Sequence, residues 1–316
     1  MSIYLVTGGA GFIGSHLVEA LVTRGETVRV LDNFVSGKRE NLAPWRDRIT
    51  LIEGDIRDRA KVTETVRGVD YVLHQAALRS VPKSMAHPEE YHEVNVSGLL
   101  TVLQAARAAK VKRFVLASSS SVYGEATRFP QSEEQPARPI SVYGATKLAG
   151  EHYCHVFATG LGLETVALRY FNVFGPRQSL ENEYAVVVPK FITALLRGEP
   201  TPIYGDGTQS RDFTFIENVI RANLLACTAP SVSGRVFNVG CGASHTVLDL
   251  ASRLNRLLGK EIPPVFQPPR PGDVPKTQAD ISSAQAHLGY RVQVSFDAGL
   301  QRTAAWFQTA PSPAAA

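Results

Sequence analysis

The first two thirds of the chain alternate short apolar runs with longer segments whose apolar residues recur every three or four positions. Short apolar runs predict strands, and the helical recurrence predicts amphipathic helices. The predicted strands are residues 3–7, 27–31, 49–53, 71–73, 113–117 and 165–170, and the predicted long helices are residues 12–24, 89–109 and 141–159. This alternation favours an α/β fold with a doubly wound parallel sheet and right-handed crossovers.

The pattern loosens after Tyr170, where prolines separate shorter elements and the proline-rich stretch 262–275 predicts a loop. A helix at 216–228 and a strand at 235–239 are expected to return to the main sheet. We therefore expect a main domain over residues 1–172, with return elements near 213–240. A smaller, interleaved lobe would cover residues 173–308, and residues 309–316 would form a disordered tail.

The composition narrows the classes of partner. The chain has 316 residues, of which 44% are hydrophobic and 20% charged, and its formal net charge is +4. The arginines are scattered and form no basic block, so nucleic-acid binding is not expected. No apolar run approaches the roughly 18 residues of a membrane span. The first strand begins at Ile3 and leaves no room for a signal peptide, so we expect a cytoplasmic location.

The cysteines and histidines suggest neither disulfides nor a metal site. Cys154, Cys227 and Cys241 are odd in number and widely spaced, which favours free thiols in a reducing compartment. His74, His152 and His155 show no spacing typical of metal ligands. We expect no bound metal.

A glycine-rich turn joins the first strand to the first helix. Gly8, Gly11 and Gly14 have the spacing G-x-x-G-x-x-G and enclose Phe12 and Ile13. Such glycines let backbone amides approach a pyrophosphate at the positive end of a helix. Asp32, at the end of the second strand, supplies a carboxylate for both adenosine ribose hydroxyls and would repel a 2′-phosphate. The turn predicts a Rossmann-type dinucleotide site that prefers NAD to NADP, although Lys38 and Arg39 lie close to Asp32 in sequence.

Polar and small residues follow the next two strands. Asp55 and Ile56 come after the third strand, where a carboxylate meets the adenine amino group. The fourth strand is followed by small and polar residues that allow close approach of the cofactor: Gln75, Ala76 and Ala77. Asn95 lies within the long helix 89–109 without a capping role, and both a solvated and a buried role stay open.

A tyrosine and a lysine four residues apart supply the candidate chemistry. Tyr143 and Lys147 share one face of the predicted helix 141–159, downstream of the serines at 118–121. Free tyrosine titrates near pH ~10, so a nearby ammonium is needed to hold the phenol close to its ionised form. With a serine on the same substrate oxygen, the group would remove a proton from a carbinol while a hydride leaves for a nicotinamide.

Several motifs together resemble one family, the extended short-chain dehydrogenase/reductases, and within it the nucleotide-sugar 4-epimerases. The motifs are the glycine turn, Asp32 and Asn33 with residues 36–42, residues 118–124, Tyr143 with Lys147, residues 169–173, and residues 211–213. The resemblance covers roughly residues 1–308 and places the catalytic hydroxyl on Ser119, the base on Tyr143 and the lysine on Lys147. Ser120 and Ser121 precede Val122, where related dehydratases and decarboxylases carry an acidic residue.

The resemblance also assigns binding residues. For NAD it adds Asn33, Ser36, Gly37, Arg79, Tyr170 and Val173, together with Ser119, Tyr143 and Lys147. For a UDP-sugar it implies Ser80, Ser120, Ser121, Tyr143, Asn172, Val187, Val188, Lys190, Tyr204, Arg211, Arg270, Asp273 and Thr277. Among these, Tyr204 would pack against uracil, Arg211 and Arg270 would pair with the diphosphate, and Asp273 would bind the ribose.

The substrate is the open point of this interpretation. Thr277 is small where relatives restricted to non-acetylated sugars carry tyrosine, so the resemblance implies UDP-GlcNAc/UDP-GalNAc, UDP-glucose/UDP-galactose, or both. A UDP-glucuronate 4-epimerase, another NAD(P)-dependent nucleotide-sugar oxidoreductase and a non-catalytic NAD-binding sensor remain alternatives. The resemblance further implies a homodimer in which helices 89–109 and 141–159 of two copies form a four-helix bundle.

Overall fold

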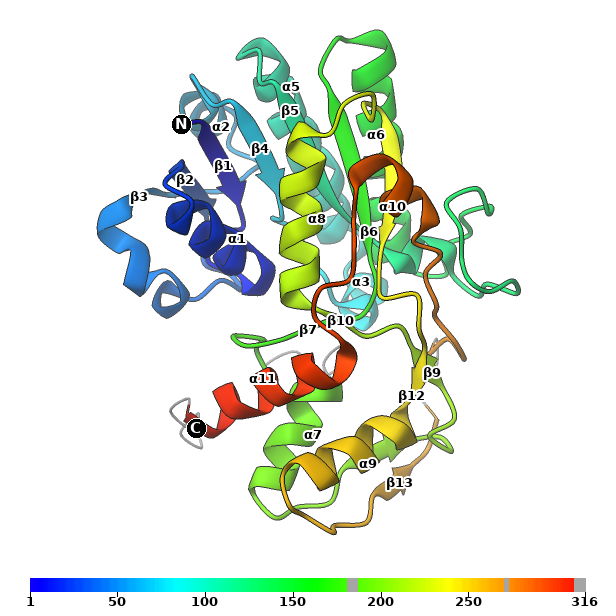
Figure 1. The fold of residues 1–316 in the computed structure, drawn as a ribbon. Coiled ribbons are helices and arrows are strands. Elements are labelled where there is room, and N and C mark those ends of the chain that lie inside the picture. The colour runs from blue at the N-terminus through cyan, green and yellow to red at the C-terminus, as the bar shows by residue number, and fades with distance from the viewer. Residues whose placement is uncertain (181–186, 270–272, 310–316) are drawn as a thin grey trace.

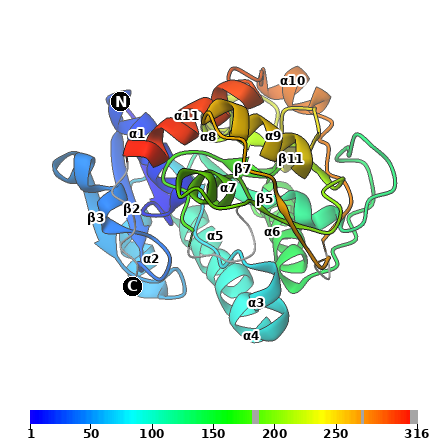
Figure 2. The same cartoon turned by 90° about the horizontal axis from the view of Figure 1, so that it is seen from below.

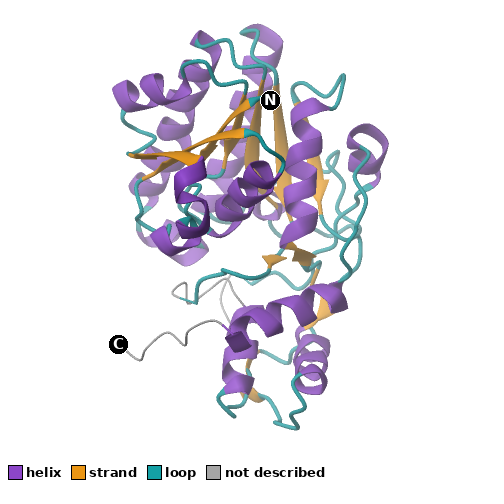
Figure 3. Ribbon diagram, turned by 60° about the vertical axis from the view of Figure 1, so that its left-hand side comes forward, coloured by secondary structure: helices purple, strands orange, loops and turns teal. Residues whose placement is uncertain are grey.

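The computed structural model describes residues 1–180, 187–269 and 273–309. Its centre is a seven-stranded sheet in the order β11-β6-β5-β4-β1-β2-β3, with every pairing parallel. Figures 1 and 3 show this sheet in the upper part of the molecule, covered by helices on both sides. The strands are β1 (Ile3–Thr7), β2 (Thr27–Asp32), β3 (Ile49–Glu53), β4 (Tyr71–His74), β5 (Arg113–Ser119), β6 (Thr165–Tyr170) and β11 (Arg235–Val239). The predicted doubly wound α/β fold is confirmed.

Alternate residues of each strand face two separate hydrophobic cores. In β1, Val6 belongs to the core beneath α1 (Phe12–Thr23) and α8 (Ile216–Thr228). Leu5 belongs to the core on the opposite face, beneath α2 (Arg59–Val66), α5 (Leu99–Ala108) and α6 (Val142–Gly160). Because both faces are covered, the strands are apolar almost throughout, as the sequence pattern indicated.

The order of the strands reverses between β1 and β4. From β1 the chain proceeds outward to β2 and β3, whereas β4 leads in the opposite direction to β5 and β6. In an open α/β sheet, a crevice forms at this reversal, outside the carboxyl ends of the strands. The glycine turn, Asp32 and Gln75 all follow strands that end at this edge.

The predicted single helix over residues 89–109 is wrong in detail. The structure has α4 (Pro88–His92), a π-helical segment (Glu93–Gly98) and then α5. Asn95 lies in the π-helical segment, and its buried side chain bonds both main-chain groups of Leu78: Nδ2 donates to the carbonyl at 2.9 Å and Oδ1 accepts from the amide at 2.8 Å. The wider π-helical turn thus coincides with hydrogen bonds from Asn95 to the loop after β4. The periodicity of the sequence does not reveal these bonds.

A smaller lobe lies below the sheet, and Figure 2 views the molecule from that side. Its helices α7 (Val187–Leu196), α9 (Val247–Leu257) and α11 (Phe296–Thr309) pack against one another. Its short strands are β7 (Val173–Phe174), β8 (Pro202–Tyr204), β9 (Ser210–Arg211), β10 (Thr214–Phe215), β12 (His245–Thr246) and β13 (Val265–Gln267). The remaining α-helices of the described residues are α3 (Val81–Ala86) and α10 (Ser282–Leu288), and short 3₁₀ helices occur at Arg39–Asn41, Ala43–Arg48 and Ser120–Tyr123.

The loop predicted over residues 262–275 contains the strand β13, which pairs in parallel with β8. Pairs of prolines flank Val265, Phe266 and Gln267, but these three residues keep the backbone N–H groups that strand pairing needs. Val265 N–H donates to the Thr201 carbonyl at 3.0 Å, and Gln267 accepts from Gly205 N–H at 2.9 Å. Sequence pattern misses the strand because it is exposed on both faces and carries no apolar alternation.

The chain returns to the main sheet after the first part of the small lobe. α8 packs on the sheet, and β11 pairs with β6 at its edge. At the other end of the chain, α11 extends to Thr309, and residues 310–316 lie outside the described part. Among the described residues, no helix is both long and apolar enough to cross a membrane.

Candidate active site

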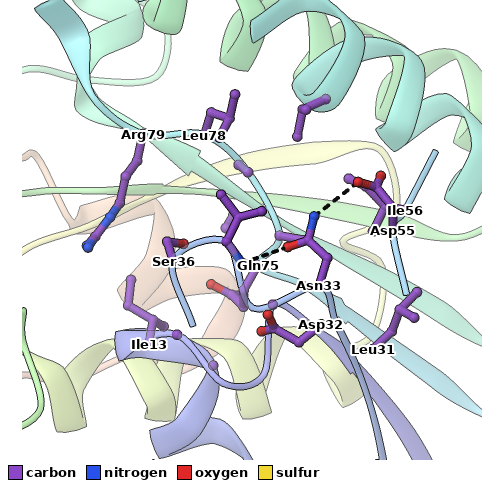
Figure 4. A pocket seen from close by; sticks show the side chains of 18 of the residues that line it. Ile13, Leu31, Asp32, Asn33, Ser36, Asp55, Ile56, Gln75, Leu78 and Arg79 are labelled. Carbon is purple, nitrogen blue, oxygen red and sulfur yellow. Dashed lines mark hydrogen bonds between the residues drawn. The ribbon is translucent and has the colours of Figure 1, made fainter. Parts of the chain in front are cut away.

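A cleft at the strand reversal is lined by the glycine turn and by the ends of β2, β4, β5 and β6 (Figure 4). Gly8 has a φ of +67°, and a Cβ there would lie 2.7 Å from the amide nitrogen of Ala76. A Cβ on Gly14 would lie only 2.1 Å from the carbonyl oxygen of Gly8. The main chain therefore forms a tight concave surface at the N-terminus of α1, which suits the pyrophosphate of a dinucleotide.

Asp32 lies at one end of this cleft with both carboxylate oxygens already partnered. Oδ2 accepts from Ala10 N–H at 2.9 Å, and Oδ1 accepts from Phe34 N–H at 2.8 Å. Each oxygen keeps a lone pair for a ribose hydroxyl. Burial raises the pKa of Asp32, and the two backbone bonds oppose that shift. Arg39 pairs with Glu53 at 2.6 Å rather than with Asp32, so the fit for NAD is stronger than sequence proximity suggested.

Asp55 faces the cleft near Asn33, whose Nδ2 donates to it at 3.0 Å (Figure 4). Arg57 donates to both oxygens of Asp55 at 2.9 Å, and this bond is the main cause that lowers the pKa of Asp55 to about 2. The carboxylate is thus fixed and ionised where an adenine amino group would meet it. Arg57 was missed from sequence, although a basic residue two positions after the acid was a signal.

The catalytic pair is placed by the start of α6. Ser141 caps the helix by accepting from Gly144 N–H at 3.1 Å, and Tyr143 and Lys147 then share the face toward the cleft. Lys147 is buried, and its Nζ donates to the Ala117 carbonyl at the end of β5 at 2.9 Å. The ammonium lies 5.8 Å from the centre of the Tyr143 ring.

The electrostatics around Tyr143 differ from the sequence-based prediction. Burial raises the pKa of the phenol, and the causes that lower it are a hydrogen bond with the Ser119 hydroxyl and the charge of Arg79. Burial also lowers the pKa of Lys147 to about 8, and Glu151 opposes that shift. In this state Arg79 is therefore the cation that favours the ionised phenol, a role that sequence reasoning did not give it.

Most of the predicted cofactor residues meet in this cleft. Those that line it are Gly8, Gly11, Phe12, Ile13, Gly14, Asp32, Asn33, Ser36, Asp55, Ile56, Gln75, Ala76, Ala77, Arg79, Tyr143, Lys147 and Tyr170. Gly37, Asn95, Ser119 and Val173 do not line it. Asn95 lies behind the cleft and hydrogen-bonds to Leu78, which lines it. Ser119 reaches the site through its hydrogen bond to Tyr143. Ser118 lines the cleft although sequence reasoning did not select it.

A second, more open pocket lies in the small lobe. It is lined by Tyr204, Gly205, Asp206, Thr208, Gln209, Phe266, Gln267, Pro269, Asp273, Val274 and Pro275. Two predicted substrate residues, Tyr204 and Asp273, are among them. Phe266 was missed because its strand was interpreted as a loop. Arg211 forms an ion pair with Asp273 beside this pocket, and Arg270 lies outside the described residues.

Several further substrate candidates line neither pocket. They are Ser80, Ser120, Ser121, Asn172, Val187, Val188, Lys190, Arg211 and Thr277. Ser80 caps α3 by accepting from Lys83 N–H. Ser121 hydrogen-bonds with Ser119, Oγ to Oγ, at 3.1 Å.

Thr277 and Asn172 form a unit at the junction of the lobes. The Thr277 hydroxyl donates to Asn172 Oδ1 at 2.8 Å and accepts from Asp212 N–H at 3.2 Å. Asn172 has a φ of +29°, which is uncommon for a residue with a side chain and is tolerated best by asparagine. Because Oδ1 is engaged, the Nδ2 group is the part of Asn172 left to donate to a ligand.

Comparison with known proteins finds similarity to enzymes that act on nucleotide sugars. The model of the NAD dependent epimerase/dehydratase family matches residues 4–240. A UDP-glucose 4-epimerase from Mycolicibacterium smegmatis is 38% identical over 309 residues, which cover 96% of this chain and 98% of that protein.

Two solved structures share the whole fold. A UDP-N-acetylglucosamine 4-epimerase from Methanobrevibacter ruminantium, in complex with UDP-N-acetylmuramic acid, superposes with a TM-score of 0.93 at 40% identity and covers 97% of this chain and 98% of its own. A UDP-glucuronic acid 4-epimerase from Bacillus cereus, in complex with UDP-glucuronic acid and NAD, superposes with a TM-score of 0.90 at 35% identity and covers 97% and 99%.

Proposed function

Because the chain belongs to the NAD-dependent epimerase/dehydratase family, we propose that it is a UDP-sugar 4-epimerase that inverts C4 of a UDP-hexose through a transient 4-keto sugar. The observation that carries this proposal is the juxtaposition of Tyr143, Ser119 and Lys147 at the edge of a cleft shaped for a dinucleotide. An acid/base pair beside such a cleft suits oxidation and re-reduction of one carbinol.

The residues that line the cleft would bind NAD along the whole length of the cofactor. The concave main chain at Gly8 and Gly14 suits the pyrophosphate, and Asp32 and Asp55 suit the adenosine. Tyr143, Lys147 and Tyr170 line the same cleft. When bound, NAD supplies the acceptor and then the donor of the hydride at C4.

The protein's own groups manage the proton. Tyr143 would take the proton from the 4-hydroxyl and return it after the sugar has turned over. Ser119, which hydrogen-bonds to the phenol, would bind the same substrate oxygen. Arg79 and Lys147 line the cleft with Tyr143, and their positive charge stabilises the phenolate as the proton leaves the hydroxyl.

For the nucleotide we propose the pocket of the small lobe. Tyr204 and Phe266 offer aromatic faces for uracil, and Asp273 offers a carboxylate for the ribose. Arg211, beside this pocket, offers planar donors for the diphosphate, and Nδ2 of Asn172 can donate to a phosphate or sugar oxygen.

For the sugar we propose that UDP-GlcNAc/UDP-GalNAc is accepted beside UDP-glucose/UDP-galactose. The support is the small, buried Thr277 at the lobe junction, whose hydroxyl is engaged within the protein. The alternative is UDP-glucuronate, which the Bacillus cereus relative acts on.

A panel of substrates tests these proposals together. Purified protein, without added NAD, is incubated with UDP-glucose, UDP-GlcNAc and UDP-glucuronate, and the products are resolved by NMR. We expect the C4 epimer of UDP-GlcNAc to form with no net absorbance of NADH. Accumulation of NADH would instead support a dehydrogenase, and conversion of UDP-glucuronate alone would support the alternative. No conversion of any sugar would contradict the proposed function.

We also propose a homodimer in which α5 and α6 of two copies form a four-helix bundle, and a cytoplasmic location. The support for the bundle is that these two helices lie side by side on one face of the sheet. The three free cysteines suit a reducing compartment. Sedimentation velocity and cell fractionation test the two proposals: a monomer at micromolar concentration would contradict the first.

A further inference from the structure

A buried carboxylate lies behind the catalytic lysine and takes no part in the proposed chemistry. Glu151 is 4% exposed and follows Lys147 by four residues, so Tyr143, Lys147 and Glu151 occupy successive turns of one face of α6. The first two line the cofactor cleft, whereas Glu151 does not.

Glu151 ties three elements together. Its Oε1 accepts from the Ser118 hydroxyl at the end of β5 and from Arg169 Nε at 2.9 Å, and its Oε2 accepts from another Arg169 nitrogen at 2.7 Å. Ser118 and Arg169 are direct neighbours across the β5–β6 pair. The carboxylate of α6 thus fixes the strand ends that carry the carbonyl partner of Lys147 and the hydroxyl of Ser119.

The charges around this site are few. Among the titratable groups that face Lys147 and Glu151, His74 on β4 has its pKa lowered to about 3 by burial, so it is neutral. Burial keeps the Cys154 thiol protonated and raises the pKa of Tyr123, whose ring lies under Arg169 at 4.7 Å, to about 12. With Tyr143 also protonated in this state, the charged groups that act on one another around Glu151 are Lys147, Glu151 and Arg169. At the margins, Arg79 acts on Tyr143 and Glu133 acts on Arg169.

We propose that Glu151 is a positioning residue of the catalytic site: it fixes the end of β5 through Ser118 and supplies the negative charge that keeps Lys147 an ammonium. Lys147 is buried, and among the described residues Glu151 is the one carboxylate that offsets the cost of that burial. This inference rests on the proposed function, because it concerns the lysine of the proposed acid/base site.

The charge of Glu151 has a measurable consequence. Loss of the Lys147 proton removes positive charge from the site as the pH rises, and the pKa of about 8 places this loss on the alkaline side of neutrality. An opposite charge nearby favours the charged form, so removing Glu151 lets Lys147 lose its proton at lower pH. A purely structural role would lower kcat equally at all pH values.

The test begins with Glu151→Gln, which keeps hydrogen-bonding groups but removes the charge. We expect the alkaline limb of kcat to move down by about one pH unit. With that shift, kcat falls about five-fold at pH 8 and changes little at pH 6, while KM stays near the wild-type value. The same shift is expected in the titration of the Lys147 ¹³Cε resonance in ¹³C-lysine-labelled holoenzyme, assigned with Lys147→Arg.

Two further variants separate charge from structure. Glu151→Gln leaves Arg169 buried without its partner, which destabilises the fold by itself. The double variant Glu151→Gln/Arg169→Gln removes both charges and is expected to fold yet keep the earlier alkaline limb. The control Glu164→Gln breaks the ion pair of Arg113, also on β5, and is expected to leave the pH profile unchanged.

The outcomes are distinct. A double variant with the wild-type pH profile, or a Lys147 titration that does not move, would overturn the proposal. Failure of both Glu151 variants to fold would also overturn it and leave the carboxylate a structural role alone. If the protein epimerised no UDP-sugar, the proposed function would fail, yet the NMR titration would still report whether Glu151 governs the charge of Lys147.

Discussion

At the scale of single residues, the active site consists of charged groups and hydroxyls that oppose the effect of burial on the catalytic tyrosine. Burial raises the pKa of Tyr143, and only the Ser119 hydroxyl and the charge of Arg79 act against it. The phenol is therefore protonated before substrate arrives. To act as a base, the phenol depends on the charges of Arg79 and Lys147 and on the charge that a bound ligand adds to the cleft.

Replacement of Tyr143 by phenylalanine tests this assignment. The ring volume is kept but the proton acceptor is lost, so we expect kcat to fall by about 10²–10⁴-fold, with NAD binding unchanged. Epimer formation by NMR and NAD content by absorbance are the two measurements. Tyr153→Phe, on the same helix and partly buried against the core, is the control and should stay near wild type. Near-normal turnover in Tyr143→Phe would end the assignment.

The specificity proposal also rests on one side chain. Thr277→Tyr should lower the turnover of UDP-GlcNAc relative to UDP-glucose by roughly ten-fold or more, because the larger ring would fill the space proposed for the N-acetyl group. The comparison is the ratio of kcat/KM for the two sugars.

A matched variant separates size from hydrogen bonding at this position. Thr277→Val keeps the shape but removes the bond to Asn172 Oδ1, so both sugars should lose affinity while their ratio stays constant. An unchanged ratio in Thr277→Tyr would remove Thr277 from the specificity argument.

At the scale of elements, the glycine turn and α6 were predictable because each combines a regular pattern with a residue that the geometry demands. The interruption of the helix predicted over 89–109 was not predictable: Asn95 takes its place through a contact with Leu78, which is remote in sequence. The strand β13 was missed for a similar reason: it forms by pairing with β8, which is remote in sequence, and its own residues show no alternation of apolar and polar positions.

Gly14→Ala tests the turn. The new Cβ would lie 2.1 Å from the Gly8 carbonyl oxygen, so the backbone has to shift. We expect a loss of roughly 1–3 kcal/mol in the free energy of unfolding and loss of NAD from the purified protein. Gly160→Ala is the control, because a Cβ there meets nothing within 4 Å. Full NAD content in Gly14→Ala would contradict the proposed position of the pyrophosphate.

At the scale of the whole molecule, the fold family and the cofactor class were predictable from motifs, and the family is confirmed by the match over residues 4–240. The assembly of the small lobe was harder to predict from the sequence. Asp212 accepts backbone bonds from Cys241 at 2.7 Å, Gly242 at 2.9 Å and Ala279 at 3.0 Å, and so joins segments far apart in sequence. Nothing in the local pattern distinguishes this carboxylate from a surface acid.

Asp212 makes stability depend on pH. Burial raises its pKa to about 6 from its ordinary value of 3.8, so between these values the folded protein binds a proton that the unfolded chain does not. Its contribution, on the order of 3 kcal/mol, is present below about pH 4 and is lost as the pH rises through about 6.

Urea unfolding across this pH range measures the effect. The free energy of unfolding of wild type minus that of Asp212→Asn should fall from pH 4 to pH 6. The exposed Asp206→Asn is the control, whose difference from wild type should not show this fall. A flat difference for Asp212→Asn would show that its pKa is not raised.

The ion pair between Arg211 and Asp273 gives the free protein an internal counter-ion at the place proposed for the diphosphate. Binding of UDP would then exchange one anion for another instead of neutralising a bare cation. The dissociation constant of UDP should therefore rise only weakly with sodium chloride, and more steeply in Asp273→Asn, where salt competes directly for the arginine. Calorimetric titration over a range of salt concentrations measures both slopes, and equal slopes would mean that the carboxylate does not leave.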